Sequence, residues 1–149
     1  MNAYFGRRYM MSSSHRLHAD RLSAEENRAA YGKCNNPNGH GHNYIIEVLA
    51  GGPVDPETGM VADLVAMDEA VRKKVLDRFD HANLNLDPIF AGVVPTTENL
   101  CRVVYRLLEG SMKPARLTHV RVEETENNFF EYCGDESYAN GGIAQWHTR

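Results

Sequence analysis

The sequence contains little that suits a membrane, a nucleic acid or an oxidising compartment. None of its apolar runs approaches the roughly 18 residues that a membrane-spanning helix needs, and its first eight residues lack the apolar core of a secretory signal. Its three cysteines are an odd number without paired spacing, which suits a reducing compartment. The net charge of -4, without any basic cluster, argues against nucleic-acid binding. We therefore expect a cytoplasmic protein that binds neither a membrane nor a nucleic acid.

Length and composition indicate one globular domain of ordinary size. A chain of 149 residues with 42% hydrophobic and 24% charged residues can bury a normal core. No internal repeat or low-complexity linker divides the chain. We expect one domain over residues 1–133, followed by a C-terminal extension of unknown role over residues 134–149.

Hydrophobic periodicity predicts two main helices and four strands. Apolar residues recur at three- and four-residue steps over residues 63–79 and 97–110, as on the buried stripe of a helix. A capping box from Ser23 to Glu26 predicts a short additional helix that ends at Gly32. Strands are predicted over residues 3–11, 42–50, 116–124 and 129–133. The order ββααββ is typical of an α+β domain with helices on one face of a four-stranded antiparallel sheet.

Two closely spaced histidines suggest a metal site. His40 and His42 precede the apolar run from Tyr44 to Leu49, and residues two apart on a strand point to the same face. His15 lies at the end of another strand-like run. Three neutral imidazoles with an open fourth position form the donor set of a catalytic zinc site. Spacing alone leaves ordinary surface or core histidines as the alternative, above all for His15.

Four further residues have side chains suited to proton transfer or substrate binding. Cys34 stands in a glycine- and asparagine-rich loop, where a nearby cation would favour its thiolate. Asp80 directly precedes His81, so the carboxylate could orient an imidazole that relays protons. Glu124 closes a predicted strand. Taken singly, the alternatives are an inert cysteine, a helix-end pair and an exposed carboxylate.

Several motifs at compatible spacing connect these residues to one family. The motifs are Ser12–Leu17, Leu22–Asn27, Gly32–Tyr44, Gly59–Val61, Phe79–Leu84, Pro95–Asn99 and Glu124–Asn128. Over residues 4–133 the chain resembles the 6-pyruvoyltetrahydropterin synthase family. Residues 134–149 run past the point where chains of that family usually end.

The resemblance implies a set of residue roles. His15, His40 and His42 match the zinc ligands of the family. Cys34, Asp80 and His81 match its catalytic triad, and Glu124 matches the glutamate that anchors the pterin ring. The implied activity is a zinc-dependent lyase that converts 7,8-dihydroneopterin triphosphate to 6-pyruvoyltetrahydropterin and triphosphate, as in tetrahydrobiopterin biosynthesis. Lys33 and Arg16 are nearby basic residues that nothing in the sequence assigns to the triphosphate.

The resemblance also implies an assembly. In the tunnelling fold, ββααββ subunits close into a twelve-stranded trimeric barrel, and two barrels stack as a homohexamer with active sites at subunit interfaces. This would explain the unprotected edges of a four-stranded sheet.

Two readings compete with the pyruvoyl-forming enzyme. One is 6-carboxytetrahydropterin synthase of queuosine biosynthesis, which acts on the same substrate. In that relative the cysteine stands closer to the histidine pair, whereas here five residues separate Cys34 from His40. The other is a non-catalytic protein that keeps the fold and binds a pterin or a partner. A complete set of Cys34, Asp80 and His81 argues against it, because a binding protein has little use for a base and a relay.

Overall fold

The computed structural model describes residues 1–135. Most of the predicted extension, including Tyr138 and Trp146, therefore lies outside the described residues. Within residues 1–135, none of the helices has the length and apolar character required to cross a bilayer.

Four long strands form the antiparallel sheet that the sequence predicts. They are β1 (Asn2–His15), β2 (His40–Pro53), β4 (Arg116–Glu123) and β5 (Phe129–Tyr132). A two-residue strand that was not predicted, β3 (Ala82–Asn83), pairs in parallel with β1, so the sheet order is β3-β1-β2-β4-β5. β1 and β2 are both longer than the predicted ranges, and their extra residues reach the histidines.

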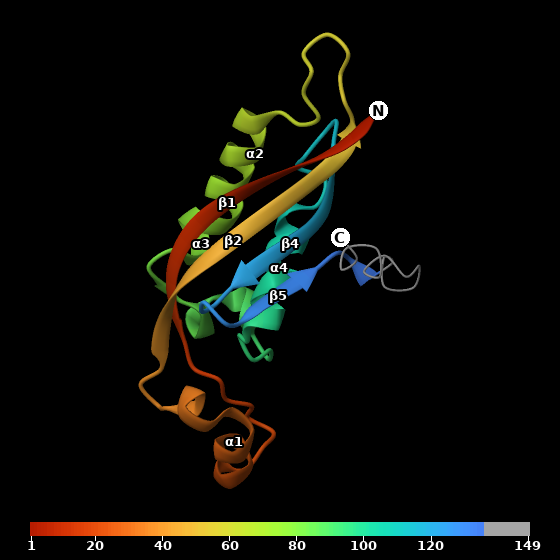
Figure 1. Ribbon diagram of the computed structural model, residues 1–149. Coiled ribbons are helices and arrows are strands. Elements are labelled where there is room, and N and C mark those ends of the chain that lie inside the picture. The colour runs from red at the N-terminus through yellow and green to blue at the C-terminus, as the bar shows by residue number, and fades with distance from the viewer. Residues whose placement is uncertain (136–149) are drawn as a thin grey trace.

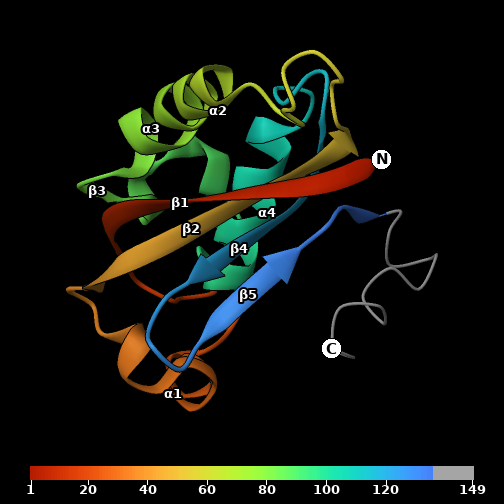
Figure 2. The same cartoon turned by 45° about the horizontal axis from the view of Figure 1, so that its top comes forward.

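The helices cover one face of the sheet, as Figures 1 and 2 show. α4 (Thr97–Leu108) begins after Thr96, whose hydroxyl accepts a hydrogen bond from the Asn99 amide. The predicted helix over residues 63–79 consists of α2 (Leu64–Val71), a π-helical stretch (Arg72–Leu76) and α3 (Asp77–Phe79). The 3.6-residue periodicity did not predict this π-helical stretch.

The hydrophobic core fills the space between the sheet and these helices. Alternate residues of β2, Tyr44, Ile46 and Val48, are fully buried, and they pack in one cluster with Phe79 of α3 and Leu100 of α4. Because side chains alternate along a strand, the residues that precede Tyr44 at two-residue steps point toward the helix layer as well. This periodicity directs His42 and His40 toward the interior.

An excursion over residues 16–39 connects β1 to β2 and carries Cys34. It contains α1 (Ala24–Tyr31) and a 3₁₀ turn (Gly32–Asn35), and it extends beyond one end of the sheet (Figure 1). The predicted capping box is present, since Ser23 and Glu26 exchange side-chain and backbone hydrogen bonds. The Leu17 amide donates to the Cys34 carbonyl at 2.9 Å, which fixes the cysteine loop against the end of β1.

The Asn27 side chain holds this excursion together. It is fully buried, accepts a hydrogen bond from the Ala19 amide, and donates to the carbonyls of Ala19, Leu22 and Ser23. Through these contacts the Ala19 amide and the Leu22 carbonyl, which lie outside the regular elements, gain hydrogen-bond partners.

Replacing Asn27 with alanine should therefore destabilise the protein. Buried backbone groups would lose their partners, and we expect the free energy of unfolding to fall by about 2 kcal/mol or more. Urea unfolding of Asn27→Ala measures this loss, with Arg28→Ala as the matched control because Arg28 is exposed on the same helix. Equal stability of the two variants would contradict the assigned role.

Candidate metal centre and active site

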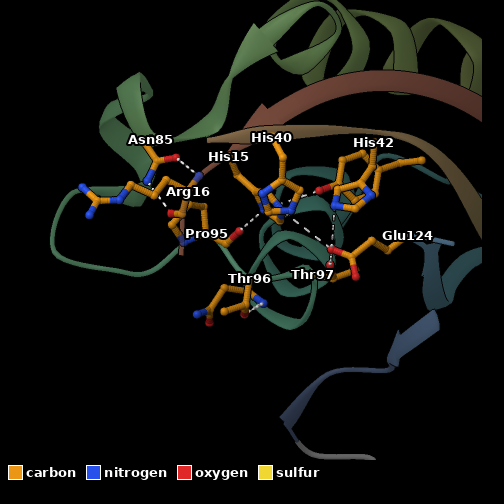
Figure 3. A network of polar contacts seen from close by, with 11 residues as sticks. His15, Arg16, His40, His42, Asn85, Pro95, Thr96, Thr97 and Glu124 are labelled. Carbon is orange, nitrogen blue, oxygen red and sulfur yellow. Dashed lines mark hydrogen bonds and ion pairs between the residues drawn. The ribbon is translucent and has the colours of Figure 1, made fainter. Parts of the chain in front are cut away.

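The three predicted histidines converge at one end of the sheet. His15 and His40 are directly paired in the β1–β2 register, and His42 lies opposite Ser13. One ring nitrogen of each histidine lies within 4.8 Å of the others, and this cluster could hold a metal ion. Figure 3 shows the imidazoles facing one another above the start of α4. Strand pairing thus brings His15, which is distant in sequence, next to the His40–His42 pair.

Hydrogen bonding orients the His15 ring for metal binding. Its Nδ1 lies 2.8 Å from the Pro95 carbonyl oxygen, so Nδ1 carries the proton and donates it. In the neutral ring, Nε2 then presents a lone pair, and it lies 3.1 Å from His40 Nε2. A hydrogen bond from the distal nitrogen to a carbonyl is the usual support of a metal-binding histidine.

The other two rings contain polar atoms without hydrogen bonds. Among the residues that the structure describes, the buried His42 Nε2 and His40 Nδ1 have no hydrogen-bond partner. A buried polar nitrogen without a partner is costly, and a cation bound between the rings would satisfy His42 Nε2. The donor set and its unsatisfied nitrogens therefore fit a metal ion.

Burial keeps the cluster in the form that binds metals. It lowers the pKa of His15, as do the neighbouring rings, although the Pro95 hydrogen bond and Glu124 act in the opposite direction. Burial also lowers the pKa of His42, with Glu124 again opposing it. A lowered pKa extends the pH range of the neutral imidazole downward, and the neutral ring is the metal ligand.

Glu124 lies beside the histidines. It follows β4 at the start of a turn in which its amide donates to the Asn128 carbonyl. Its Oε1 accepts a hydrogen bond of 2.7 Å from the Thr97 hydroxyl, and lies 3.5 Å from His42 Nε2 and 3.7 Å from His15 Nε2. The family resemblance assigned Glu124 only to substrate binding. Its position next to the imidazoles is therefore a finding of the structure.

Sequence reasoning missed three residues that support the site: Pro95, Thr97 and Tyr44. The fully buried Tyr44 places its hydroxyl 3.5 Å from His15 Nδ1. Its position was available from the sequence, because it follows His42 by two residues on the same strand. The parts played by Pro95 and Thr97 depend on tertiary contacts with His15 and Glu124, and such contacts leave no local signal in the sequence.

Cys34 lies near this cluster in the 3₁₀ turn of the excursion. It is a free and partly buried cysteine. Burial raises the pKa of the Tyr44 hydroxyl most, and negative charge on Glu124 and Cys34 raises it further. A negative charge at Cys34 would therefore act on the Tyr44 hydroxyl, which lies 3.5 Å from His15 Nδ1.

Asp80 and His81 lie beside β1, at the sheet edge where β3 pairs with it. Asp80 accepts hydrogen bonds from the Ser12 amide at 2.8 Å and from His81 Nδ1 at 3.0 Å, and the Ser12 contact chiefly lowers its pKa. The predicted pairing of the carboxylate with the imidazole is therefore present. The His81 amide also donates to the Ser12 carbonyl, and the His81 side chain is 82% exposed. The exposed imidazole is accessible to a second molecule.

Arg16 is turned away from the imidazoles (Figure 3). Its Nε donates to the Asn35 carbonyl at 3.1 Å, and its backbone exchanges hydrogen bonds with Asn85. The arginine supports the excursion in this structure.

Comparisons with known proteins agree on one family. The family model described as 6-pyruvoyl tetrahydropterin synthase matches residues 5–135. The human 6-pyruvoyl tetrahydrobiopterin synthase is 44% identical over 134 residues, which cover 89% of this chain and 92% of the relative. The protein of that name from Dictyostelium discoideum is 46% identical over 130 residues, covering 87% of this chain and 94% of the relative.

A solved structure gives the same result in three dimensions. The 6-pyruvoyl tetrahydropterin synthase of Caenorhabditis elegans superimposes with a TM-score of 0.86 at 42% identity, covering 91% of this chain and 97% of the other. A Plasmodium vivax protein of the same name, at 15% identity and a TM-score of 0.62, shares the fold. The matching motifs, the superimposed fold and the histidine cluster thus place this chain in the 6-pyruvoyl tetrahydropterin synthase family.

Proposed function

We propose that this protein is a zinc-dependent lyase that converts 7,8-dihydroneopterin triphosphate to 6-pyruvoyltetrahydropterin with release of triphosphate. The observation that carries the proposal is the convergence of His15, His40 and His42 beside Glu124, in a chain of this family. Three neutral imidazoles are the ligand set of catalytic zinc, in which the fourth position serves substrate. A zinc ion bound there would act as a Lewis acid toward oxygen atoms of the substrate side chain.

The protein's own residues would bind the pterin and move its protons. The Glu124 carboxylate can accept two hydrogen bonds from the ring, at its 2-amino group and N3–H, which orients the ring. Cys34, as a thiolate, would accept a proton from a side-chain carbon. The His81 imidazole, held in one tautomer by Asp80, would relay protons. The ring is reduced as the side chain is oxidised, so the reaction needs no external redox cofactor.

The arrangement of these residues supports an active site shared between subunits. Cys34 lies in the excursion, next to the end of β1, whereas His81 lies at the β3 edge of the sheet with its side chain exposed. Within the described chain, β5 pairs only with β4, and β1 pairs with β3 only at Ser13 and Ser14. Unpaired edges of this kind are suited to strand pairing with neighbouring copies. We propose that trimeric barrels form in this way and stack as a homohexamer, in which His81 of one subunit serves the cluster of another.

The state of the cysteines supports a reducing location. Cys34 and Cys101 carry free thiols, as the cytoplasm keeps them. We propose that the enzyme works there.

The product of the reaction tests the proposed activity. We expect purified protein given dihydroneopterin triphosphate to release triphosphate together with the 6-pyruvoyl product, and to lose this activity on chelation of its metal. Chromatography of the pterins, with metal analysis of the same sample, measures both. Formation of the 6-carboxy product would assign the protein to its queuosine-pathway relative, and tight pterin binding without turnover would indicate a binding protein.

Replacement of Cys34 separates a base from a metal ligand. We expect Cys34→Ala to retain zinc and pterin binding while turnover falls by about 10²–10⁴-fold, the usual contribution of a general base. Zinc content and turnover are measured on one preparation, with Cys101→Ala as the control because Cys101 is buried in α4. Wild-type turnover, or zinc loss equal to that of His42→Ala, would refute the assignment.

A mixing experiment tests whether two subunits share each site. Cys34→Ala and His81→Asn should each be inactive, and asparagine tolerates the positive φ of 57° at position 81. Random mixed oligomers should recover about a quarter of wild-type activity, because half of the sites have an intact Cys34 and half of those an intact His81. Turnover of the co-expressed oligomer is the readout. If both residues of a site came from one chain, mixing would restore nothing.

A further inference from the structure

We propose that Ser12 and Asn43 form a positioning pair for the Asp80–His81 relay. The inference rests on the proton relay of the proposed function and adds two residues to it. Neither residue has to touch the substrate. Ser12 holds the relay through its backbone, and the Asn43 side chain holds Ser12 in place.

One residue of β1 contacts both members of the relay. The Ser12 amide donates to Asp80 Oδ1 at 2.8 Å, and the Ser12 carbonyl accepts a hydrogen bond from the His81 amide at 2.6 Å. The other carboxylate oxygen, Asp80 Oδ2, lies 3.0 Å from His81 Nδ1. Asp80 thus bonds the strand through one oxygen and the imidazole through the other. A shift of Ser12 would therefore move the carboxylate and the ring together.

The register of β1 and β2 explains why Ser12 needs a side-chain bond. Along an antiparallel pair, residues that exchange both backbone hydrogen bonds alternate with residues that exchange none. Ser12 lies opposite Asn43, and it directs both of its backbone groups to residues 80 and 81. Ser12 and Asn43 are therefore a pair of the second kind, in which the side chains come closest.

The two side chains supply the bond that the backbone does not make at this position. The Ser12 hydroxyl donates to Asn43 Oδ1 at 2.6 Å. Both residues line the same cavity as His81. The hydrogen bond thus ties the strand position that holds the relay to β2, which carries two of the three histidines of the metal cluster.

The His81 imidazole depends on such support. Its side chain is 82% exposed, and its backbone has a positive φ of 57°, so the direction of the ring depends on the contacts with Ser12 and Asp80. Proton transfer requires groups within hydrogen-bond reach, and a misplacement of about 1 Å can lower the rate by about 10²-fold. Loss of the Ser12–Asn43 bond should therefore slow turnover and leave substrate binding unchanged.

Removal of either side chain tests the pair. We expect Ser12→Ala and Asn43→Ala each to lower kcat by about 10-fold or more, with KM and zinc content unchanged. Ser12→Thr keeps the hydroxyl and should restore turnover, since threonine also suits a strand. Ser14→Ala is the matched control, because Ser14 lies two residues further along β1 and opposite Gly41, which has no side chain. Steady-state kinetics and metal analysis of the full-length variants measure these effects.

Two further readouts distinguish positioning from a general structural role. The double variant Ser12→Ala/Asn43→Ala should be no slower than either single variant, because all three lose the same hydrogen bond. The solvent deuterium isotope effect on kcat should increase in each variant, since proton transfer becomes the slow step. The bond lies at the exposed surface, so urea unfolding should change little.

Wild-type kcat in both single variants, with or without a loss of stability, would overturn the proposal. A raised KM with unchanged kcat would overturn it as well, because it would indicate a direct contact with substrate. Either result would leave the lyase activity of the wild-type protein standing. A wild-type protein without turnover would overturn the proposed function and this inference with it.

Discussion

The antiparallel pairing of β1 with β2 is the constraint on which the site depends. Its register sets His15 opposite His40 and Ser13 opposite His42, so two segments separated by a 24-residue excursion present their imidazoles at one point. A slip of one residue would turn His40 and His42 to the outer face, together with Tyr44 and Ile46. The apolar residues therefore secure the position of the metal ligands, because burial of the core and alignment of the site require the same register.

The helix layer supplies what the two strands lack. The start of α4 brings the Pro95 carbonyl to His15 and the Thr97 hydroxyl to Glu124, and these contacts select the tautomer of one ring and the orientation of the carboxylate. Both are short hydrogen bonds between buried or half-buried groups, where exchange with water does not weaken them. These hydrogen bonds fix the His15 ring and the Glu124 carboxylate before substrate binds. Supporting hydrogen bonds of this kind orient the ligands of a metal centre.

The edge of β1 that pairs with β3 has a different chemistry. Asp80 and His81 are tied to Ser12 and are exposed, and His81 adopts a positive φ of 57° that non-glycine residues rarely take. Such backbone strain is retained where the surrounding structure holds it, commonly at functional sites. A hydrogen-bonded pair at an exposed position has a catalytic use if a second copy of the chain contacts it. Within residues 1–135, β5 pairs only with β4 and β1 pairs with β3 only at Ser13 and Ser14, which agrees with such a contact.

Much of this protein was predictable from local patterns. The alternation that leads from His40 to Val48, the capping box at Ser23 and the helical stripe over residues 97–108 are local signals, and the structure contains each of them. The order ββααββ followed from hydrophobic periodicity, and the family motifs, whose family the comparisons confirm, added the roles expected of the candidate residues. The sequence by itself thus determined the elements, the histidines and the family. Only the tertiary structure decided that Glu124 Oε1 lies within 3.7 Å of two imidazoles, that Pro95 orients His15 and that His81 is exposed. The contacts of the site join residues 27 to 109 positions apart, and their approach depends on packing.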